Sequence, residues 1–295
     1  DWLVKAPIPM VWGASAPYIN GGSVENKGFE VVLSWNDKVG DFTYSVNGNI
    51  SFNKNKLTKL QTKPLYDDGK TSDHVNASVV YNRPGKALGS FWGYISDGVN
   101  PETGELMYRD LDGNGKVSPG DQTYIGDPNP DFTFGLTNNF SYKNFSLSIF
   151  VQGVLGIQTL DANVIETLYP TNEYRNRIAK YYTGRWTENN PTNKYPSGVN
   201  PSNYGGQYSI NSLTVVDASF VRIKNINLSY DIPIKKNNII QAASIYGAID
   251  NLFTFTDYDG FDPDASASGS DKVSKVNYNS YPLARTVRFG VNITF

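Results

Sequence analysis

Apolar and polar residues alternate with a period of two over several stretches of about ten residues. The pattern is clearest in residues 132–142 and 145–152, which the pair Lys143-Asn144 separates. From Phe132 onward one parity is mainly aromatic or aliphatic, and the other holds Thr, Gly, Asn and Ser. Such alternation predicts strands with one apolar face, and two of them across a short turn predict a β-hairpin.

The same pattern predicts about eight strands in the chain. Strands near ten residues exceed the usual length of about five or six and match the ~9–11 residues that a tilted strand needs to cross a bilayer. Their second face is neutral and polar, whereas the outer face of a soluble β-sandwich more often carries charges. We therefore expect an all-β fold, an antiparallel transmembrane β-barrel. The expected strands are residues 29–36, 42–52, 88–95, 132–142, 145–152, 219–232, 245–255 and 285–295.

Long polar segments separate the predicted strands. Outer-membrane barrels carry long loops on one side and short turns on the other, so we expect these segments to form an extracellular mouth. Within the strand at 219–232 the apolar parity changes after Ile223, which predicts a bulge near Lys224-Asn225. The expected loops of the mouth are residues 53–87, 97–126, 156–214 and 257–280, and the third expected strand, at 88–95, lies between two of them. Residues 1–28 are also expected to form a loop, because they are rich in Pro and Gly.

Composition and the absence of known motifs argue against several classes of function. The 26 Lys and Arg residues nearly balance 28 Asp and Glu residues, so a basic nucleic-acid surface is not expected. The absence of cysteine excludes disulfides, thiolate metal sites and a cysteine nucleophile. His74, the one histidine, is expected to be a solvated loop residue. No hydrolase, zinc-protease or nucleotide-binding motif is present, so we propose no catalytic residues and no enzyme.

One motif has the spacing of a calcium-binding loop. Residues 110–121 place oxygen donors at positions 1, 3, 5, 7, 9 and 12, with Gly115 at the sharp turn. Position 12 is an Asp where an EF-hand has Glu, and this shorter acid is expected to bind through one oxygen. The alternative is a metal-free Asp/Asn/Gly turn. The expected Ca²⁺ ligands are the side chains of Asp110, Asp112, Asn114, Ser118 and Asp121 and the carbonyl of Lys116, with Ser118 direct or water-bridged.

No helical pattern flanks this motif, so its expected role is to stiffen a long loop. Loop aromatic residues have two open interpretations, stacking on sugars or peptide groups and ordinary packing. The polar and aromatic loops fit glycans and peptides alike, so the substrate and the residues that contact it stay open. The aromatic residues concerned are Trp92, Tyr169, Tyr181, Tyr182, Trp186, Tyr204 and Tyr208.

An ordered set of short segments resembles one family, the SusC/RagA-like TonB-dependent transporters of Bacteroidetes outer membranes. Each segment is weak by itself, but together they follow the family's order over nearly the whole chain. The chain also ends in Phe295, which looks like an outer-membrane assembly signal. The segments are residues 26–30, 88–94, 110–121, 125–130, 150–153, 185–191, 218–225 and 250–255.

The resemblance implies a 22-stranded barrel in the bacterial outer membrane, with an N-terminal plug, energised by TonB. It also implies a SusD-like surface lipoprotein that delivers oligosaccharides or peptides. Residues 1–295 would form the C-terminal part of the barrel, about eight strands, in contact with the lipid bilayer. The plug, the first strands and the TonB-binding segment would lie outside this sequence, which begins at Asp1 without an initiator Met.

Two other classes remain open at this stage. A secreted, calcium-stiffened β-sandwich that binds glycans would be soluble without detergent. A carbohydrate hydrolase would need an acidic pair about 5–10 Å apart at a cleft.

Overall fold

The computed structural model describes most of the chain. His74 and Tyr204 lie outside the described residues. Those described are residues 2–6, 8–70, 76–169, 176–199, 206–234, 239–264 and 275–295.

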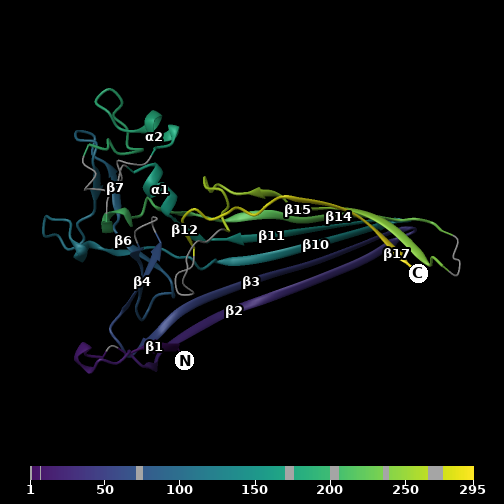
Figure 1. Cartoon of the computed structure of the whole chain (residues 1–295), viewed down its shortest axis with the longest axis horizontal. Helices are drawn as coiled ribbons and strands as arrows, with labels where there is room; N and C mark the ends of the chain where they lie inside the picture. Colours follow the sequence, from purple (N-terminus) through teal and green to yellow (C-terminus); the bar gives the residue numbers. More distant parts are fainter. Residues whose placement is uncertain are drawn as a thin grey trace.

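An open, antiparallel sheet of eight strands, of which all but the short β1 are long, dominates the molecule and curves along its long axis (Figure 1). The expected all-β, antiparallel architecture is confirmed. Alternating side chains make a strand rather than a helix here, because every second residue then shares one face. In sheet order the strands are β1 (Trp2–Lys5), β2 (Tyr18–Val39), β3 (Phe42–Leu60), β10 (Phe132–Tyr142), β11 (Phe145–Leu155), β14 (Phe220–Asp231), β15 (Ala242–Phe255) and β17 (Thr286–Thr294).

The remaining elements gather at one end of this sheet, and two-residue turns join β2 to β3 and β10 to β11 at the other end (Figure 1). Among the described residues, no helix is long and apolar enough to cross a membrane. The small sheets are β4 (Leu65–Lys70), β5 (Asn76–Asn82), β6 (Phe91–Gly93) and β9 (Thr123–Gly126); β7 (Ser96–Val99) and β8 (Leu106–Tyr108); and β12 (Gln158–Asp161), β13 (Val215–Asp217) and β16 (Val276–Asn277). The helices are η1 (Met10–Trp12), α1 (Ala162–Thr167), α2 (Ala179–Gly184), η2 (Pro119–Asp121) and η4 (Gly206–Ser209).

Two assignments made from the sequence are wrong, one of a strand to the long sheet and one of a loop. Residues 88–95 do not join the long sheet: only β6 is strand there, and it pairs with β5 and β9. The aromatic side chains of this segment fill the core beneath the loops instead of facing lipid. Phe91 and Tyr94 are fully buried there. The expected loop at 1–28 instead contains β1 and the start of β2, because the strand continues through its glycines, with Gly22 paired to Trp2 and Gly21 at a bulge.

The predicted bulge is confirmed. Val151 pairs with Ile223 and the preceding Phe150 pairs with Asn225, so Lys224 has no partner in the register. The extra residue shifts the side-chain parity by one. Ile223 and Ile226 therefore both lie on the apolar face, although the sequence places them on opposite parities.

Two rows of aromatic residues border the apolar face. At the loop-bearing end, the rings of Phe29, Phe52 and Phe132 lie side by side, with centroid distances of 4.8 and 5.2 Å. At the other end the register aligns Phe42 with Tyr142, and Phe145 and Tyr230 continue this row. The two rows are ten residues apart on β3, about 33 Å along a strand. With a strand tilt near 40°, this spans about 25 Å, the height of the apolar band of a membrane barrel.

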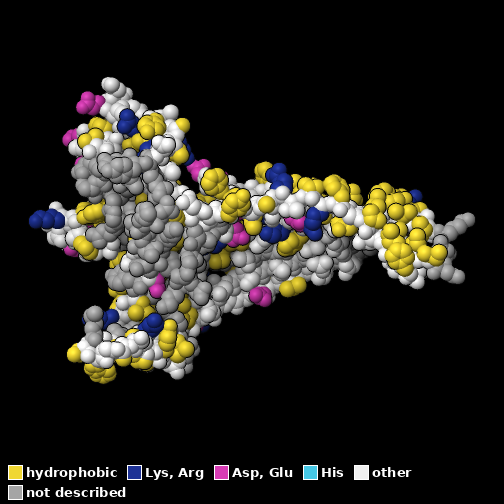
Figure 2. All heavy atoms as spheres, viewed as in Figure 1, with side chains coloured by type: hydrophobic (Ala, Val, Ile, Leu, Met, Phe, Trp, Pro, Cys, Tyr) yellow, Lys and Arg dark blue, Asp and Glu magenta, His cyan; other side chains and the backbone are white. Residues whose placement is uncertain are grey.

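The apolar face continues onto the last strands. Figure 2 shows apolar side chains gathered at the end of the sheet away from the loops. On β17, Phe289 is 84% exposed, an arrangement that water would disfavour and lipid would not.

The opposite face of the sheet is polar. Ser146, Ser148 and Asn227 line a groove of about 690 Å³ on this face. At its edge, Asp250 accepts a hydrogen bond of 2.6 Å from Asn225 and forms a 2.8 Å ion pair with Arg288. This face is suited to a water-filled interior.

Substitution of Leu136 by arginine tests which face meets lipid. Leu136 lies midway between the aromatic rows on the apolar face, so Leu136→Arg should lower the free energy of unfolding by about 2–4 kcal/mol. The matched variant Thr137→Arg places the same cation on the polar face and should cost less than about 1 kcal/mol, as at other water-facing positions. Denaturation of the receptor carrying this chain, in lipid vesicles, measures both. Equal losses would contradict the assignment of the faces.

Candidate functional site

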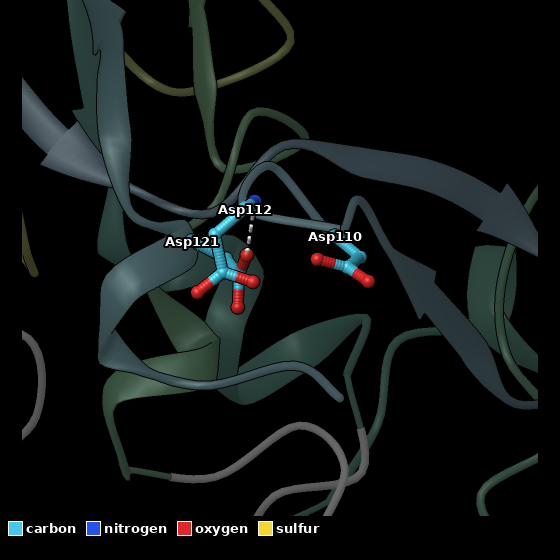
Figure 3. A group of neighbouring side chains, drawn as sticks. All are labelled: Asp110, Asp112 and Asp121. Carbon is cyan, nitrogen blue, oxygen red and sulfur yellow. Dashed lines mark hydrogen bonds between the residues drawn. The ribbon is translucent and has the colours of Figure 1, made fainter. Parts of the chain in front are cut away.

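The predicted calcium loop folds as a tight turn after β8. Gly113 and Gly115 adopt φ values of 74° and 79°, a left-handed conformation that glycine permits without strain. This turn brings Asp110, Asp112 and Asp121 together, and each contributes an oxygen within 4.8 Å of the others (Figure 3).

Asp121 holds the two ends of the loop together. One of its oxygens accepts hydrogen bonds from the N–H groups of Leu111 (2.7 Å) and Asp112 (3.2 Å), and the other from the N–H (2.7 Å) and hydroxyl (3.2 Å) of Ser118. The bond from the Ser118 backbone contributes most to lowering the pKa of Asp121, and together the bonds outweigh the opposing effect of burial. The carboxylate is therefore charged at neutral pH although the side chain is fully buried.

The other carboxylates organise the turn itself. Asp110 accepts 2.7 Å hydrogen bonds from the N–H groups of Gly113 and Gly115. Asp112 accepts from the backbone and side-chain N–H groups of Asn114 at 3.0 and 2.8 Å.

The remaining predicted ligands lie on the same loop. Asn114 and Lys116 are exposed, and the Asn114 side-chain oxygen accepts a 2.8 Å bond from the N–H of Lys116. The Ser118 hydroxyl accepts from the N–H of Gly120 at 3.2 Å and thereby caps η2. The structure thus gathers the three acids, while these three residues fix the path of the loop around them.

The donor set fits calcium. Ca²⁺ binds oxygen at about 2.3–2.6 Å, so two ligands on opposite sides of one ion lie roughly 5 Å apart. Each of the three carboxylates has an oxygen within 4.8 Å of the others, which falls within this limit. Asp121 accepts four hydrogen bonds within the loop, two on each oxygen, so an ion bound to it would replace one of these bonds.

A tyrosine cluster joins this loop to the core beneath it. The rings of Tyr94, Tyr108 and Tyr208 lie 5.0–5.7 Å apart. The Tyr208 hydroxyl donates to the carbonyl of Val117 at 3.5 Å. Burial, with smaller contributions from Tyr208 and Asp121, raises the pKa of Tyr94 to about 12, so the ring stays neutral. The loop at residues 110–121 therefore packs on an aromatic cluster.

Most of the loop aromatic residues proposed for stacking pack inside the loops instead. Tyr169, Tyr181 and Trp186 are buried in one apolar cluster with Val99 and Leu106. Trp92 packs between Tyr81 and Tyr124, with centroid distances of 4.6 and 5.0 Å. Tyr182 is 60% exposed and remains available to a partner or substrate. A hydrophobic core under the loops explains these aromatic residues better than ligand contact does.

A buried ion pair fastens the loop after β15 to the polar face of the sheet. The Arg222 guanidinium donates to Asp262 at 2.6 Å and to Thr254 at 2.8 Å, and both members of the ion pair are almost fully buried. Asp262 also accepts from the N–H groups of Asp264 and Leu283 at 2.9 and 3.0 Å. Burial alone would raise the pKa of Asp262, but these bonds outweigh burial and lower it. Nothing in the sequence pattern identified this pair, because its members are 40 residues apart.

A sheet of long strands with aromatic rows at both borders, a polar inner face and loops gathered at one end defines a membrane β-barrel wall. No protein-family model matches the chain. The TonB-dependent receptor P3 of Formosa agariphila is 34% identical over 100% of this chain and 31% of its own length. The TonB-dependent receptor SusC of Bacteroides thetaiotaomicron is 28% identical over 99% of this chain and 28% of its length.

Solved structures give the same answer. The RagAB peptide transporter matches with a TM-score of 0.80 and 25% identity, over 99% of this chain and 32% of that chain. These comparisons confirm the resemblance: the chain corresponds to part of a SusC/RagA-like TonB-dependent receptor. The open sheet is accordingly part of a barrel. The chain spans about a third of the length of the curated relatives it matches.

The buried pair predicts a large effect from a small change. Asp262→Asn leaves the Arg222 charge buried without a counter-charge, and should cost about 3–5 kcal/mol of loop docking. The matched change Asp250→Asn weakens a partly exposed pair with Arg288 and should cost less than about 1 kcal/mol. Hydrogen exchange at residues 256–264 measures both. Similar exchange in the two variants would contradict a role for the buried pair.

Acid should release the same loop. Because the pKa of Asp262 is lowered in the folded chain, its contribution is complete above the ordinary Asp pKa of about 3.9 and is lost as pH falls through the lowered value. Exchange at residues 256–264 should therefore rise at acid pH before exchange in β14 does. Asp262→Asn should exchange rapidly at neutral pH already.

Proposed function

We propose that the chain forms part of the wall and the mouth of an outer-membrane, TonB-dependent importer of nutrients. The single observation that carries this proposal is the eight-stranded sheet with its loops at one end, which superimposes on RagAB with a TM-score of 0.80. The 34% identity to a TonB-dependent receptor over the whole chain supports the same assignment. The loop-bearing end is the extracellular side in this proposal, and residues 1–295 act as one unit of the barrel.

Import by such a receptor needs no chemical step in this chain. The polar groove beside Ser148 and Asn227 forms part of the passage, and the loops contact the cargo. Energy comes from TonB through a plug that lies outside this sequence. The relatives are receptors and transporters, which favours transport over catalysis.

The partner in this proposal is a SusD-like surface lipoprotein, and the cargo is an oligosaccharide or a peptide. The similarity to SusC and to RagAB supports a partner of this kind. RagAB is a peptide transporter, which supports peptide cargo, while the polar loops suit glycans equally.

We further propose that Ca²⁺ occupies the loop at residues 110–121 and stiffens the mouth. The spacing of its three carboxylates supports the ion, and their negative charge requires compensation. Through Val117 and the tyrosine cluster, the ordered loop holds neighbouring segments at a fixed height above the barrel.

Co-purification tests the proposed importer. Native outer membranes are extracted with detergent, the receptor is captured through a tag on this chain, and mass spectrometry identifies what accompanies it. We expect a surface lipoprotein, peptides from a plug, and bound oligosaccharide or peptide cargo. Recovery of the chain alone from the water-soluble fraction would contradict the importer and favour the secreted glycan-binding alternative.

Calcium titration tests the loop. Asp112→Asn preserves the acceptor for the Asn114 N–H but removes one negative charge, and should weaken Ca²⁺ binding at least about tenfold, since affinity follows the number of charged ligands. Isothermal titration of the purified receptor measures the affinity, and protease resistance of residues 110–121 reports the stiffening. Asp257→Asn removes an exposed acid elsewhere and is the control. Absence of Ca²⁺ binding by the unaltered receptor would establish the metal-free turn instead.

A further inference from the structure

The outward face of β2 and β3 changes character just beyond the aromatic row at the loop-bearing end. On β3, Asn53 and Asn55 line a small pocket on the inner face with Asn129. The alternate residues, Lys54 and Lys56, therefore lie on the same outward face as Phe52.

The neighbouring strand brings more charge to this position. In the register of β2 with β3, Lys27 lies directly opposite Lys54, and Glu25 lies opposite Lys56. We name Lys27, Lys54 and Lys56 the lysine cluster. All three are exposed, and with Glu25 they leave two net positive charges on a patch of four residues.

Within the part of the chain that the structure describes, acidic side chains neutralise the positive charge of the lysine cluster only in part. Lys27 forms a 2.9 Å ion pair with Glu25. The side-chain amines of Lys54 and Lys56 make no ion pair or hydrogen bond with a described residue. Like charges directly opposite each other destabilise a strand pair, so the facing Lys27 and Lys54 favour an anion between them.

The backbone beneath the lysine cluster is held firmly from the inner side. Asn55 donates to Asn26 at 2.8 Å and accepts from the N–H of Leu88 at 2.9 Å. The N–H of Leu57 donates to the carbonyl of Lys86 at 2.8 Å. These bonds extend the two strands as a rigid ribbon beyond the apolar band, so the lysines keep their spacing.

The depth of the lysine cluster in the membrane indicates which kind of molecule it can contact. Lys27 and Lys54 lie two residues beyond Phe29 and Phe52, about 7 Å along a strand. Aromatic rows mark the border between hydrocarbon and headgroups, and lysine side chains extend toward the polar side of that border. The amines therefore lie at the level of lipid phosphates rather than in the lumen or among the loops.

We propose that the lysine cluster binds the phosphate of an anionic lipid headgroup in the leaflet at the loop-bearing end of the barrel. The aromatic row of Phe29, Phe52 and Phe132 contacts the acyl chains of the same lipid. The proposal depends on the membrane placement of the sheet and is independent of cargo, lipoprotein partner and TonB.

Native mass spectrometry of the delipidated receptor carrying this chain tests the proposal, with phosphatidic acid and phosphatidylcholine of the same acyl chains as probes. Phosphatidic acid should bind more tightly. The triple variant Lys27→Gln, Lys54→Gln, Lys56→Gln should lose about 100-fold in affinity for it, at roughly fivefold for each lysine. The control variant Lys38→Gln, Lys143→Gln, Lys194→Gln removes the same charge elsewhere and should bind as the unaltered receptor does. Glu25→Gln removes the competing acid and should tighten binding.

The outcomes separate this proposal from its alternatives. Equal binding of the two lipids, or equal affinity in the two triple variants, would overturn it. If inorganic phosphate displaces phosphatidic acid at a similar concentration, the lysine cluster is a site for free anions and the lipid proposal fails. Uptake of cargo is measured separately, so loss of lipid binding with intact uptake is distinguishable from failure of the importer itself.

Discussion

The structure depends first on the need of every backbone N–H and C=O group in hydrocarbon for a partner within the protein. Each residue of β10 is in register with both β3 and β11, without interruption between Phe132 and Tyr142. This continuous pairing fixes which side chains face outward, and the aromatic rows follow from it. The bulge at Lys224 is in register with the middle of the apolar band, since the flanking pairs involve Phe150 and Val151, which face Thr137 and Leu136, and it restores the apolar face rather than breaking it.

Beyond the apolar band, apolar residues lie inside the protein instead of on its outer surface. The wall is apolar outside and polar inside, whereas the loop end buries apolar residues such as Phe91, Leu160 and Val276 in a core of its own. Water surrounds this end, so the hydrophobic effect drives these residues inward. The buried pair of Arg222 and Asp262 joins the two regions, since one member belongs to a wall strand and the other to a loop.

Charge is placed to suit these two surroundings. Carboxylates gather in the loop at residues 110–121, where backbone N–H groups stabilise their negative charge. Lysines gather on the outward face just past the aromatic row, at the depth of lipid headgroups. The proposed calcium ion would stiffen the mouth from within, and the proposed lipid contact would hold its base against the membrane. In the proposed importer, these two contacts would hold both regions in place while cargo passes.

The spacing of the calcium-loop motif was sufficient to predict that Asp110, Asp112 and Asp121 meet, and the period of two was sufficient to predict the antiparallel wall, its apolar face and the bulge, because strand geometry and loop chemistry are local. The period of two misplaced residues 88–95, since an aromatic strand in a buried loop core and one in a membrane wall have the same alternation. Contacts between distant segments were beyond its reach: the pair of Arg222 with Asp262, the tyrosine cluster around Tyr94, and Lys27 opposite Lys54 exist only once register and loop docking bring them together. Periodicity acts along one strand, but these contacts depend on which strands are neighbours, and tertiary structure alone decides that.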